Sequence, residues 1–289
     1  MGREDFQLSV DAAEVYEAQF VPALFGRWAP HLVRAAGVQP GQSVLDVACG
    51  TGVVAREAAR LLQGRGRVVG LDINAGMLAV ARRVSPGLEW VEADALALPF
   101  PDGSFDVVLC QAGLMFVPDP VHALREMARV AAPDGTVAVQ VWDELRAQTA
   151  WAPFYEVVER HAGPDAVDLI GSYWRLGDLV ALRESLAAAG LRPVDTLTRT
   201  DTAAFPSVDE FVATEVGGTP LRSRLTDEAY TRILEGARDA LGPHRAADGS
   251  LELPTRGHIV TARAERGPGG RNSEGTPAAP ARRGRPDAG

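Results

Sequence analysis

The chain has 289 residues, and its 29 basic side chains, all of them arginines, stand against 38 acidic ones, for a formal charge of −9. The absence of lysine excludes Schiff-base chemistry and a phosphate-binding P-loop. A composition of 46% hydrophobic and 23% charged residues is typical of a soluble globular protein. The acidic balance argues against a nucleic-acid partner, and no apolar run in the sequence is long enough to span a membrane.

Two cysteines, Cys49 and Cys110, are too few for a disulfide framework or a four-thiolate zinc site. Residues 1–5 lead into no apolar signal core, so secretion is not expected. We therefore expect a cytoplasmic protein without a metal centre. Because arginine is the only strong base, the gene is expected to be rich in GC, which indicates a bacterial source.

The N-terminal segment, residues 1–38, is expected to be helical and to lie over the active site, with Pro22 and Pro30 breaking a helix at 15–36 into pieces. From Ser43 onward, short apolar runs alternate with amphipathic stretches. The expected strands are 43–47, 67–72, 88–92, 105–110 and 136–141, and the expected helices between them are 51–62, 75–84 and 121–131. Near-continuous apolar strands separated by helices indicate a parallel sheet that is covered on both faces.

The second half of the chain is less regular. Helices are expected at 151–161, 176–189, 208–215 and 227–241, and strands at 191–200 and 257–264. With the first five strands, these give a Rossmann-like α/β fold, which is a doubly wound, mostly parallel seven-stranded sheet with helices on both faces and an added helical cap. We expect one domain over 39–265, with cap insertions at about 144–190 and 205–250. Residues 266–289 contain ten Gly or Pro in 24 positions and are expected to be disordered.

A glycine-rich turn follows the first expected strand and opens a helix. Its Gly50-x-Gly52-x-x-Ala55 pattern satisfies a loose dinucleotide fingerprint, and Asp72 stands twenty residues after Gly52 at the end of the next strand, where it can accept ribose hydroxyls. A nicotinamide-dependent oxidoreductase is therefore one candidate. A sulfonium nucleoside is favoured because Asp46 would repel a pyrophosphate but attract an ammonium, and because Asp94 after the third strand can accept the amino group of adenine.

Taken in order, these motifs resemble those of class I S-adenosylmethionine-dependent methyltransferases, in the small-molecule branch similar to the ubiquinone and menaquinone C-methyltransferases. The motifs that carry the resemblance are Asp46 to Gly52, Gly70-Leu71-Asp72, Asp94-Ala95 with Leu98-Pro99-Phe100, and Ser104-Phe105-Asp106-Val107-Val108. The resemblance covers roughly residues 39–142, which is about a third of the chain. It implies S-adenosyl-L-methionine as the cofactor and a small molecule as the methyl acceptor.

The resemblance also assigns residues to the methionine end of that cofactor. Gly50 and Gly52 would pass under the methionine and ribose, and Ala48 would line the same turn. Asp46 would hold the methionine ammonium, directly or through water. The backbone carbonyl of Gln111, at the end of the fourth strand, would help to bind that ammonium.

At the nucleoside end, the resemblance implies that Asp72 accepts the ribose hydroxyls while Ile73 packs on the adenine. Asp94 would accept the adenine amino group, and the Ala95 N–H would donate to the ring. Met77 is expected to contribute to the same end of the site.

Each role has a structural alternative. Tyr16 either closes over the cofactor or packs in the N-terminal segment. Asp72 could cap a helix, Asp46 could brace its loop, and Asp94 could serve only the turn that contains it. Cys49 is interpreted as a small buried filler rather than a nucleophile, because no base accompanies it in the sequence.

No general base stands out, so the catalytic residues stay unknown. The five histidines are interpreted as structural, and they are His31, His122, His161, His244 and His258. Aromatic residues between Trp142 and Trp174 either line an apolar acceptor pocket or pack a helical cap. The helices expected between 208 and 241 form a lid or an oligomer contact, so a homodimer is one expected assembly.

A natural-product acceptor of secondary metabolism is expected from the resemblance alone. The fold permits three other functions, because cofactor motifs do not dictate the reaction. The same cofactor site could serve a non-methylating reaction such as a cyclisation or an isomerisation. The chain could also be the oxidoreductase considered above, or a noncatalytic binder.

Overall fold

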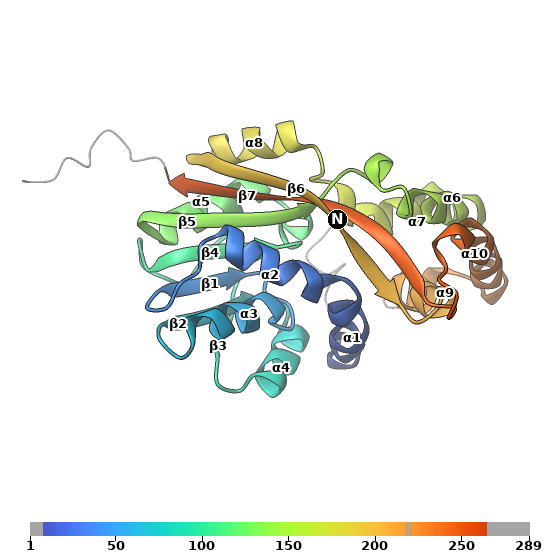
Figure 1. Ribbon diagram of the computed structural model, residues 1–289, viewed down its shortest axis with the longest axis horizontal. Helices are drawn as coiled ribbons and strands as arrows, with labels where there is room; N and C mark the ends of the chain where they lie inside the picture. The colour runs from blue at the N-terminus through green and yellow to red at the C-terminus, as the bar shows by residue number, and fades with distance from the viewer. Residues whose placement is uncertain (1–7, 218, 220, 265–289) are drawn as a thin grey trace, which may run out of the picture.

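The computed structural model describes residues 8–217, 219 and 221–264, and its centre is one seven-stranded sheet in the order β3-β2-β1-β4-β5-β7-β6 (Figure 1). The strands are β1 (Ser43–Val47), β2 (Arg67–Asp72), β3 (Glu89–Glu92), β4 (Phe105–Gln111), β5 (Ala131–Trp142), β6 (Leu191–Phe205) and β7 (Leu251–Ala264). The first five strands are parallel to one another, and β7 is antiparallel to both β5 and β6. The expected α/β class with a mostly parallel seven-stranded sheet is confirmed.

Helices cover both faces of this sheet. The α-helices of the described residues, on the sheet and beyond it, are α1 (Val10–Val15), α2 (Gly26–Ala35), α3 (Val53–Leu62), α4 (Ala75–Val84), α5 (Pro120–Val130), α6 (Trp151–Ala162), α7 (Pro164–Ile170), α8 (Leu179–Ala188), α9 (Val208–Val212) and α10 (Asp227–Ala240). In the view of Figure 1, α2 and α3 lie in front of the strands and contact each other. Helices α5 and α8 also pack on each other and against the strands. Helices α6, α9 and α10 gather beyond the sheet as a helical cap, in which α10 packs on α6.

The N-terminal helices form one continuous run rather than the broken pieces expected from the two prolines. Between α1 and α2 lies a π-helix, η1 (Tyr16–Phe25), which contains Pro22, while Pro30 lies inside α2. A proline has no N–H and crowds the carbonyl four residues before it. We infer that the wider π-helical turn accommodates Pro22, so the chain stays helical where an α-helix would kink.

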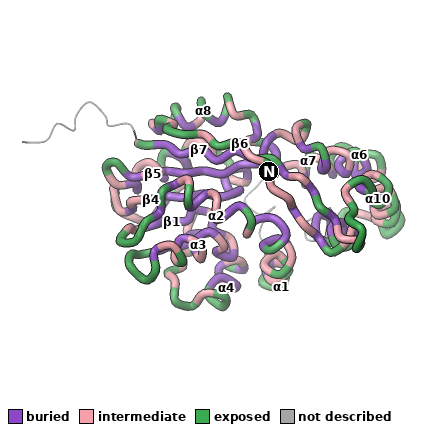
Figure 2. Tube along the Cα trace, viewed as in Figure 1, coloured by how far each residue is buried: buried purple, intermediate pink, exposed green. Residues whose placement is uncertain are grey.

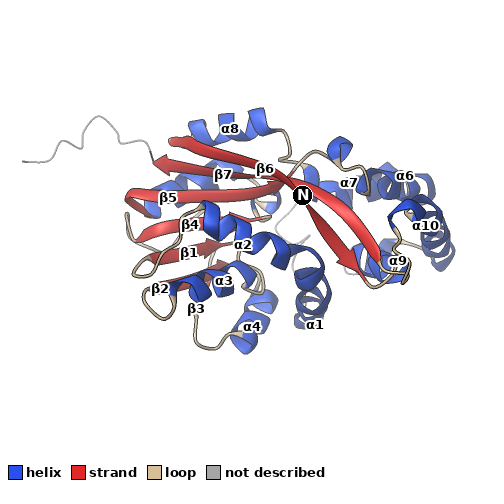
Figure 3. Ribbon diagram, in the orientation of Figure 1, coloured by secondary structure: helices blue, strands red, loops and turns tan. Residues whose placement is uncertain are grey.

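The last two strands are longer than the sequence pattern indicates, and they leave the sheet together. Strand β5 pairs with β7 only between Gly257 and Ala262, whereas β6 pairs with β7 along its whole length, from Leu191↔Ala264 to Phe205↔Leu251. The far half of this pair is therefore a two-stranded ribbon, and Figure 3 shows it running from the sheet to the cap helices. The ribbon ends at α9, so the position of the cap is set by the sheet.

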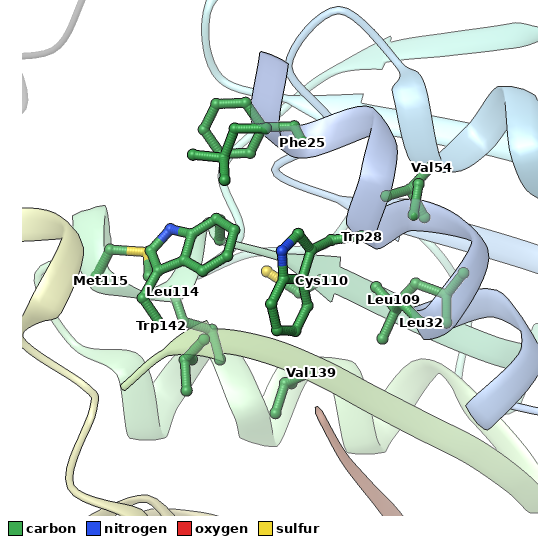
Figure 4. Packing of buried hydrophobic residues seen from close by; sticks show 14 of the residues in the cluster. Phe25, Trp28, Leu32, Val54, Leu109, Cys110, Leu114, Met115, Val139 and Trp142 are labelled. Atoms are coloured by element: carbon green, nitrogen blue, oxygen red, sulfur yellow. The ribbon is translucent and has the colours of Figure 1, made fainter. Parts of the chain in front are cut away.

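Buried residues concentrate along the strands and on one side of the helices that pack on them, as Figure 2 shows. In the close view of Figure 4, Trp28 of α2 lies beside Trp142 at the end of β5, and their ring centroids are 5.1 Å apart with one edge toward the other face. Cys110 is buried in the same cluster as a free thiol. The tail at 266–289, expected to be disordered, lies outside the described residues.

Candidate active site

A cavity of about 720 Å³ opens at the carboxyl ends of β1, β2 and β4, where the strand order reverses between β1 and β4. This is the edge at which doubly wound sheets bind their ligands, and the volume falls in the usual range for ligand sites, roughly 300–1,000 Å³. Ten of the eleven residues predicted to hold a cofactor line it, and these are Tyr16, Asp46, Ala48, Gly50, Asp72, Ile73, Met77, Asp94, Ala95 and Gln111. The eleventh, Gly52, is not among the lining residues.

The end of β2 is tied to the glycine turn by a carboxylate. One oxygen of Asp72 accepts the backbone N–H of Gly50 at 2.8 Å, and the other accepts that of Asn74 at the same distance. The helix α4 is capped by Asn74, whose side chain accepts the Met77 N–H. Asp72 is therefore not the helix cap, and its half-buried carboxylate faces the cavity. Burial raises the pKa of Asp72, which backbone donors partly offset.

Asp46 is the most deeply buried acid of the site, at 1% exposure, and it lies at the end of β1. Its Oδ2 accepts the Ala55 N–H from the first turn of α3 at 3.0 Å, so it does brace the loop. Burial raises the pKa of Asp46 to about 8. Because the carboxyl also lines the cavity, a cationic ligand placed there would favour its ionised form.

Gly52 has a packing reason to be a glycine. It begins α3 with φ +87°, and a Cβ at this position would overlap the indole of Trp90 on β3. The same ring covers Gly70 of β2, where a Cβ would overlap it as well. The Trp90 Nε1–H donates to the carbonyl of Ser85 at 3.0 Å, which fixes the ring. The proposed contact of Gly52 with the cofactor stays a prediction.

Two alanines in the left-handed region follow the two strands at the switch point. Ala48 follows β1 with φ 55°, Ala112 follows β4 with φ 48°, and both line the cavity. The two turns are close together, because a Cβ on Gly113 would come within 2.6 Å of the Ala48 Cβ. Such conformations are costly for alanine and concentrate at functional sites. The Gln111 side chain donates to the Phe25 carbonyl at 3.0 Å, so it joins β4 to the N-terminal helices.

The turn after β3, which contains Asp94, is held in place by α5. Asp94 lines the cavity and also accepts the Leu96 N–H at 3.0 Å, so the turn role and a ligand role coexist. After it, Arg129 donates to the carbonyls of Leu98 and Phe100 at 2.9 and 2.8 Å. Local sequence patterns give no signal for Arg129, because about thirty residues separate it from Leu98 and Phe100.

The N-terminal segment forms one wall of the cavity through Tyr16 and its neighbours. A Cβ on Gly50 would lie 3.8 Å from the Tyr16 ring, so this tyrosine stands directly over the glycine turn. Burial raises the pKa of Tyr16 well above its usual range. The wall is tied to the body by ion pairs of Glu17 with Arg56 at 2.9 Å, and of Glu14 with Arg83.

The rest of the cavity wall comes from the segment after β4, from the residues between α7 and α8, and from the loop after η5 (Ala213–Gly217). The residues that contribute there are Phe116, Val117, Pro118, Tyr173, Arg175 and Thr219. Phe116 and Tyr173 pack edge to face with centroids 5.3 Å apart. Of the aromatic residues expected between 142 and 174, Tyr173 lines the cavity, whereas the others pack in the core, as Trp151 does against Trp174 and Phe211.

Among the described residues, no histidine lines the cavity. His31 of α2 lies between Asp201 at 3.2 Å and Arg199 at 2.9 Å, and burial followed by the Arg199 charge lowers its pKa. His258 of β7 contacts Thr198 at 2.8 Å and Asp143 at 3.3 Å. Both therefore join secondary-structure elements.

The last features of the site are a buried thiol and the absence of a metal-binding cluster among the described residues. Cys49 lines the cavity as a buried free thiol, and burial raises the pKa of its thiol well above the usual range. Within the described ranges, no group of three or more His, Cys, Asp or Glu residues could hold a metal ion. In the same part of the chain, no helix combines the length and the apolar character needed to cross a membrane.

Comparison with known proteins agrees with this geometry. A family model described as a methyltransferase domain matches residues 45–139. The ubiquinone/menaquinone biosynthesis C-methyltransferase UbiE of Hahella chejuensis is 45% identical over 118 residues, which cover 39% of this chain and 47% of that protein. UbiE of Shewanella sp. strain W3-18-1 is 32% identical over 191 residues, which cover 60% of this chain and 76% of the relative. A structure of phosphoethanolamine N-methyltransferase 2 of Haemonchus contortus shares the fold, with a TM-score of 0.56, 19% identity, and coverage of 90% of this chain and 58% of that one.

The fold, the family match and the Shewanella relative together show that the chain belongs to the class I S-adenosylmethionine-dependent methyltransferases. Within that family, its sequence is similar to UbiE. The chain spans about half of the length of the first relatives that it matches, as in the 47% of the Hahella protein.

Proposed function

We propose that this protein transfers a methyl group from S-adenosylmethionine to a small-molecule acceptor. The observation that carries the proposal is one cavity that brings three carboxylates, Asp46, Asp72 and Asp94, to the ends of three successive strands. A pyrophosphate cofactor would be repelled there, whereas a sulfonium nucleoside with an ammonium group carries the complementary charge.

The residues fit that cofactor in charge and in space. Asp46 would hold the methionine ammonium, and Asp72 would accept the ribose hydroxyls while its other bonds keep Gly50 in place. Ile73 keeps 39% of its surface exposed in the cavity, which leaves an apolar face for adenine. When bound, the cofactor supplies an activated methyl group whose leaving atom is a neutral thioether, so no acid is needed for the departure.

The protein's own contribution is then alignment and exclusion of water. Tyr16 covers the glycine turn from one side, and Phe116 and Tyr173 line another part of the cavity. We propose an acceptor with an aromatic or otherwise apolar ring, because the rings of Phe116 and Tyr173 offer it an apolar surface. The quinone relatives and a natural-product acceptor are both compatible with such a surface, and a cytoplasmic location is part of the same proposal.

Two binding measurements and one assay test this function. Calorimetry with S-adenosylmethionine and NAD in parallel should give binding of the first alone. A panel of apolar phenols and quinols should then release S-adenosylhomocysteine together with a methylated product. Tight binding of NAD without S-adenosylmethionine would overturn the proposal. Product formation from an acceptor that gains no methyl group would instead favour a cyclisation or an isomerisation at the same site.

A further inference from the structure

The charges around the cavity are unevenly distributed. Arg175 directly follows the 3-10 turn η4 (Gly171–Trp174) and lines the cavity. Among the described residues that line it, Arg175 alone carries a positive charge, whereas Asp46, Asp72 and Asp94 are acids. The turn η4 contacts β5, while the acids lie at the ends of β1 and β2 and after β3, on the other side of the switch point. The cavity therefore has an acidic side for the cofactor and one cation elsewhere in its wall.

The backbone on both sides of Arg175 is held by packing. Trp174 is buried, and its ring packs on that of Trp151 with centroids 5.4 Å apart. The Gly177 N–H donates to the Trp174 carbonyl at 3.2 Å, and a Cβ on Gly177 would come within 2.2 Å of the Glu144 backbone nitrogen. The guanidinium is thus carried by a fixed turn, which lowers the entropy lost when it binds a ligand.

No described acid neutralises Arg175. Its side chain is exposed and makes no ion pair or hydrogen bond to any described residue. The two acids on which the following turn packs, Asp143 and Glu144, pair instead with Arg256 at 2.7 Å and Arg146 at 2.6 Å. A guanidinium that lines a ligand-sized cavity without a protein partner is available for an anionic group of the ligand.

We propose that Arg175 binds a carboxylate of the methyl acceptor, so that the acceptor is an aromatic or otherwise apolar ring acid. This inference rests on the proposed methyl transfer and names the acceptor class of that same site. A guanidinium presents N–H donors in a planar fork that matches the two oxygens of a carboxylate. One cation balances a single negative charge, and the acids of the cofactor side would repel a dianion such as a phosphate more strongly.

The same charges determine how such an acceptor lies. Its carboxylate would be repelled by the three acids if it faced the cofactor side, and it is attracted by Arg175. Its ring would lie against Phe116 and Tyr173, which line the same cavity and pack edge to face. The part of the ring remote from the carboxylate is then the part presented to the cofactor.

Binding to protein saturated with S-adenosylhomocysteine tests this assignment without turnover. The probes are 3-hydroxy-2-naphthoate and 3-hydroxy-2-naphthamide, which share one ring system and differ in charge. By calorimetry, the wild type should bind the carboxylate roughly tenfold more tightly than the amide, the scale of a hydrogen bond to a charged group. In Arg175→Gln, affinity for the carboxylate should fall roughly 10- to 100-fold while affinity for the amide stays the same. Arg175→Lys should lie between, because lysine keeps the charge and loses the planar fork.

The control is Arg160→Gln, which replaces an exposed arginine in the last turn of α6 that does not line the cavity. This variant should bind both probes as the wild type does. The proposal is overturned if the naphthoate does not bind the wild type, if the two probes bind equally, or if 2-naphthyl phosphate binds more tightly than the naphthoate. An unchanged affinity for the naphthoate in Arg175→Gln has the same consequence.

The affinity for S-adenosylhomocysteine separates this proposal from the proposed function. Arg175→Gln should bind it as the wild type does, and a loss of this affinity would instead assign Arg175 to the carboxylate of the cofactor. If the wild type itself does not bind S-adenosylhomocysteine, the proposed function fails. The same two probes, compared on the protein alone, then decide whether Arg175 binds a carboxylate.

A second measurement uses the unaltered protein, so it does not depend on how a variant folds. Phenylglyoxal modifies accessible arginine side chains, and mass spectrometry of the digested protein gives the extent of modification at each position. The naphthoate should protect Arg175, the naphthamide should not, and Arg160 should react to the same extent in all samples. Modification of Arg175 that is equally fast with and without the naphthoate would refute the proposal.

Discussion

The carboxylate of Asp72 accepts the backbone N–H of Gly50 at 2.8 Å, so the end of β2 and the turn after β1 share one hydrogen bond across the mouth of the cavity. A second oxygen accepts the Asn74 N–H, which sets the start of α4. The residue proposed to bind the ribose thus also holds the turn over which the cofactor would lie.

Replacing this carboxylate should therefore weaken cofactor binding in two ways. For Asp72→Ala, we expect the affinity for S-adenosylhomocysteine to fall by roughly 1.5–3 kcal/mol, the scale of a charge-assisted hydrogen bond. Calorimetry would measure this, with Asp239→Ala on the exposed end of α10 as the control. Equal affinities in the two variants would remove Asp72 from the binding site.

Cofactor binding should depend on pH through Asp46. Its pKa of about 8 in the free protein means that the carboxyl is largely protonated at neutral pH, whereas the ammonium of the cofactor requires the ionised form. Affinity should rise as pH increases from about 6 to 8, by up to about tenfold per unit, with release of a proton. Calorimetry in buffers of different ionisation enthalpy would detect that proton. If the affinity of the wild type does not change with pH, and Asp46→Asn gives the same pH profile as the wild type, then Asp46 only braces its loop.

The packing of Trp90 on Gly52 predicts a loss of stability that is separable from binding. Gly52→Ala places a Cβ into the indole and into a left-handed backbone, and we expect it to lower the free energy of unfolding by about 1–3 kcal/mol. Trp90→Leu should be less damaging in the Gly52→Ala background than in the wild type, because the overlap is relieved. Urea denaturation of the four proteins gives this coupling. If the effects of the two substitutions on the free energy of unfolding are additive, contact with the Trp90 indole is not the reason that position 52 requires glycine.

The stability of the fold should respond to Glu215 as pH changes. A carboxyl whose pKa is raised by folding, here to about 8, stabilises the native state most fully below its ordinary value of 4.5, and this contribution is lost as pH rises toward 8. The stability of Glu215→Gln relative to the wild type should therefore increase between pH 5 and 8. Urea titrations at three pH values would show the trend, and parallel curves for the two proteins would contradict it. Glu210→Gln should show no such trend.

Loss of the ion pair between Glu17 and Arg56 should speed the exchange of the cofactor. The pair joins η1 to α3 at 2.9 Å, and its side chains are 17% and 23% exposed. For Glu17→Gln, we expect a faster dissociation of S-adenosylhomocysteine, by about two- to fivefold, which is the effect of losing up to about 1 kcal/mol. Stopped-flow fluorescence would measure the rate. A dissociation rate equal to that of the wild type would show that the ion pair does not retain the N-terminal wall.

The centre of the sheet could be predicted from the sequence because β1, β2 and β4 are largely buried and read as continuous apolar runs. The positions of Asp46, Asp72 and Asp94 around one cavity could be predicted as well, since each lies at or just after the end of an expected strand. The sequence pattern underestimates the lengths of β6 and β7, because the half of each strand that forms the ribbon lies outside the sheet and has no long apolar run. The cap could not be placed from local patterns, since Tyr173 and Thr219 come to line one cavity only through tertiary packing.

The N-terminal run shows a further limit of local rules. Pro22 is a helix breaker on average, yet the chain continues through it in π-helical form. Gly52 is predicted to serve the ligand, and the structure adds a second reason for glycine there, since its neighbour in space is Trp90 from a strand 38 positions later. A single sequence contains no signal for either outcome.

The ribbon of β6 and β7 gives the two walls of the cavity different freedom to move. The cap is connected to the sheet by main-chain hydrogen bonds between β6 and β7 that continue those of the sheet. An outward movement of the cap would therefore require many of these bonds to break at once. The wall formed by α1 and η1 is fastened by surface ion pairs and by side-chain packing. We therefore expect ligands to enter and leave the cavity on the N-terminal side. The opposite wall should stay in place and determine which acceptors fit.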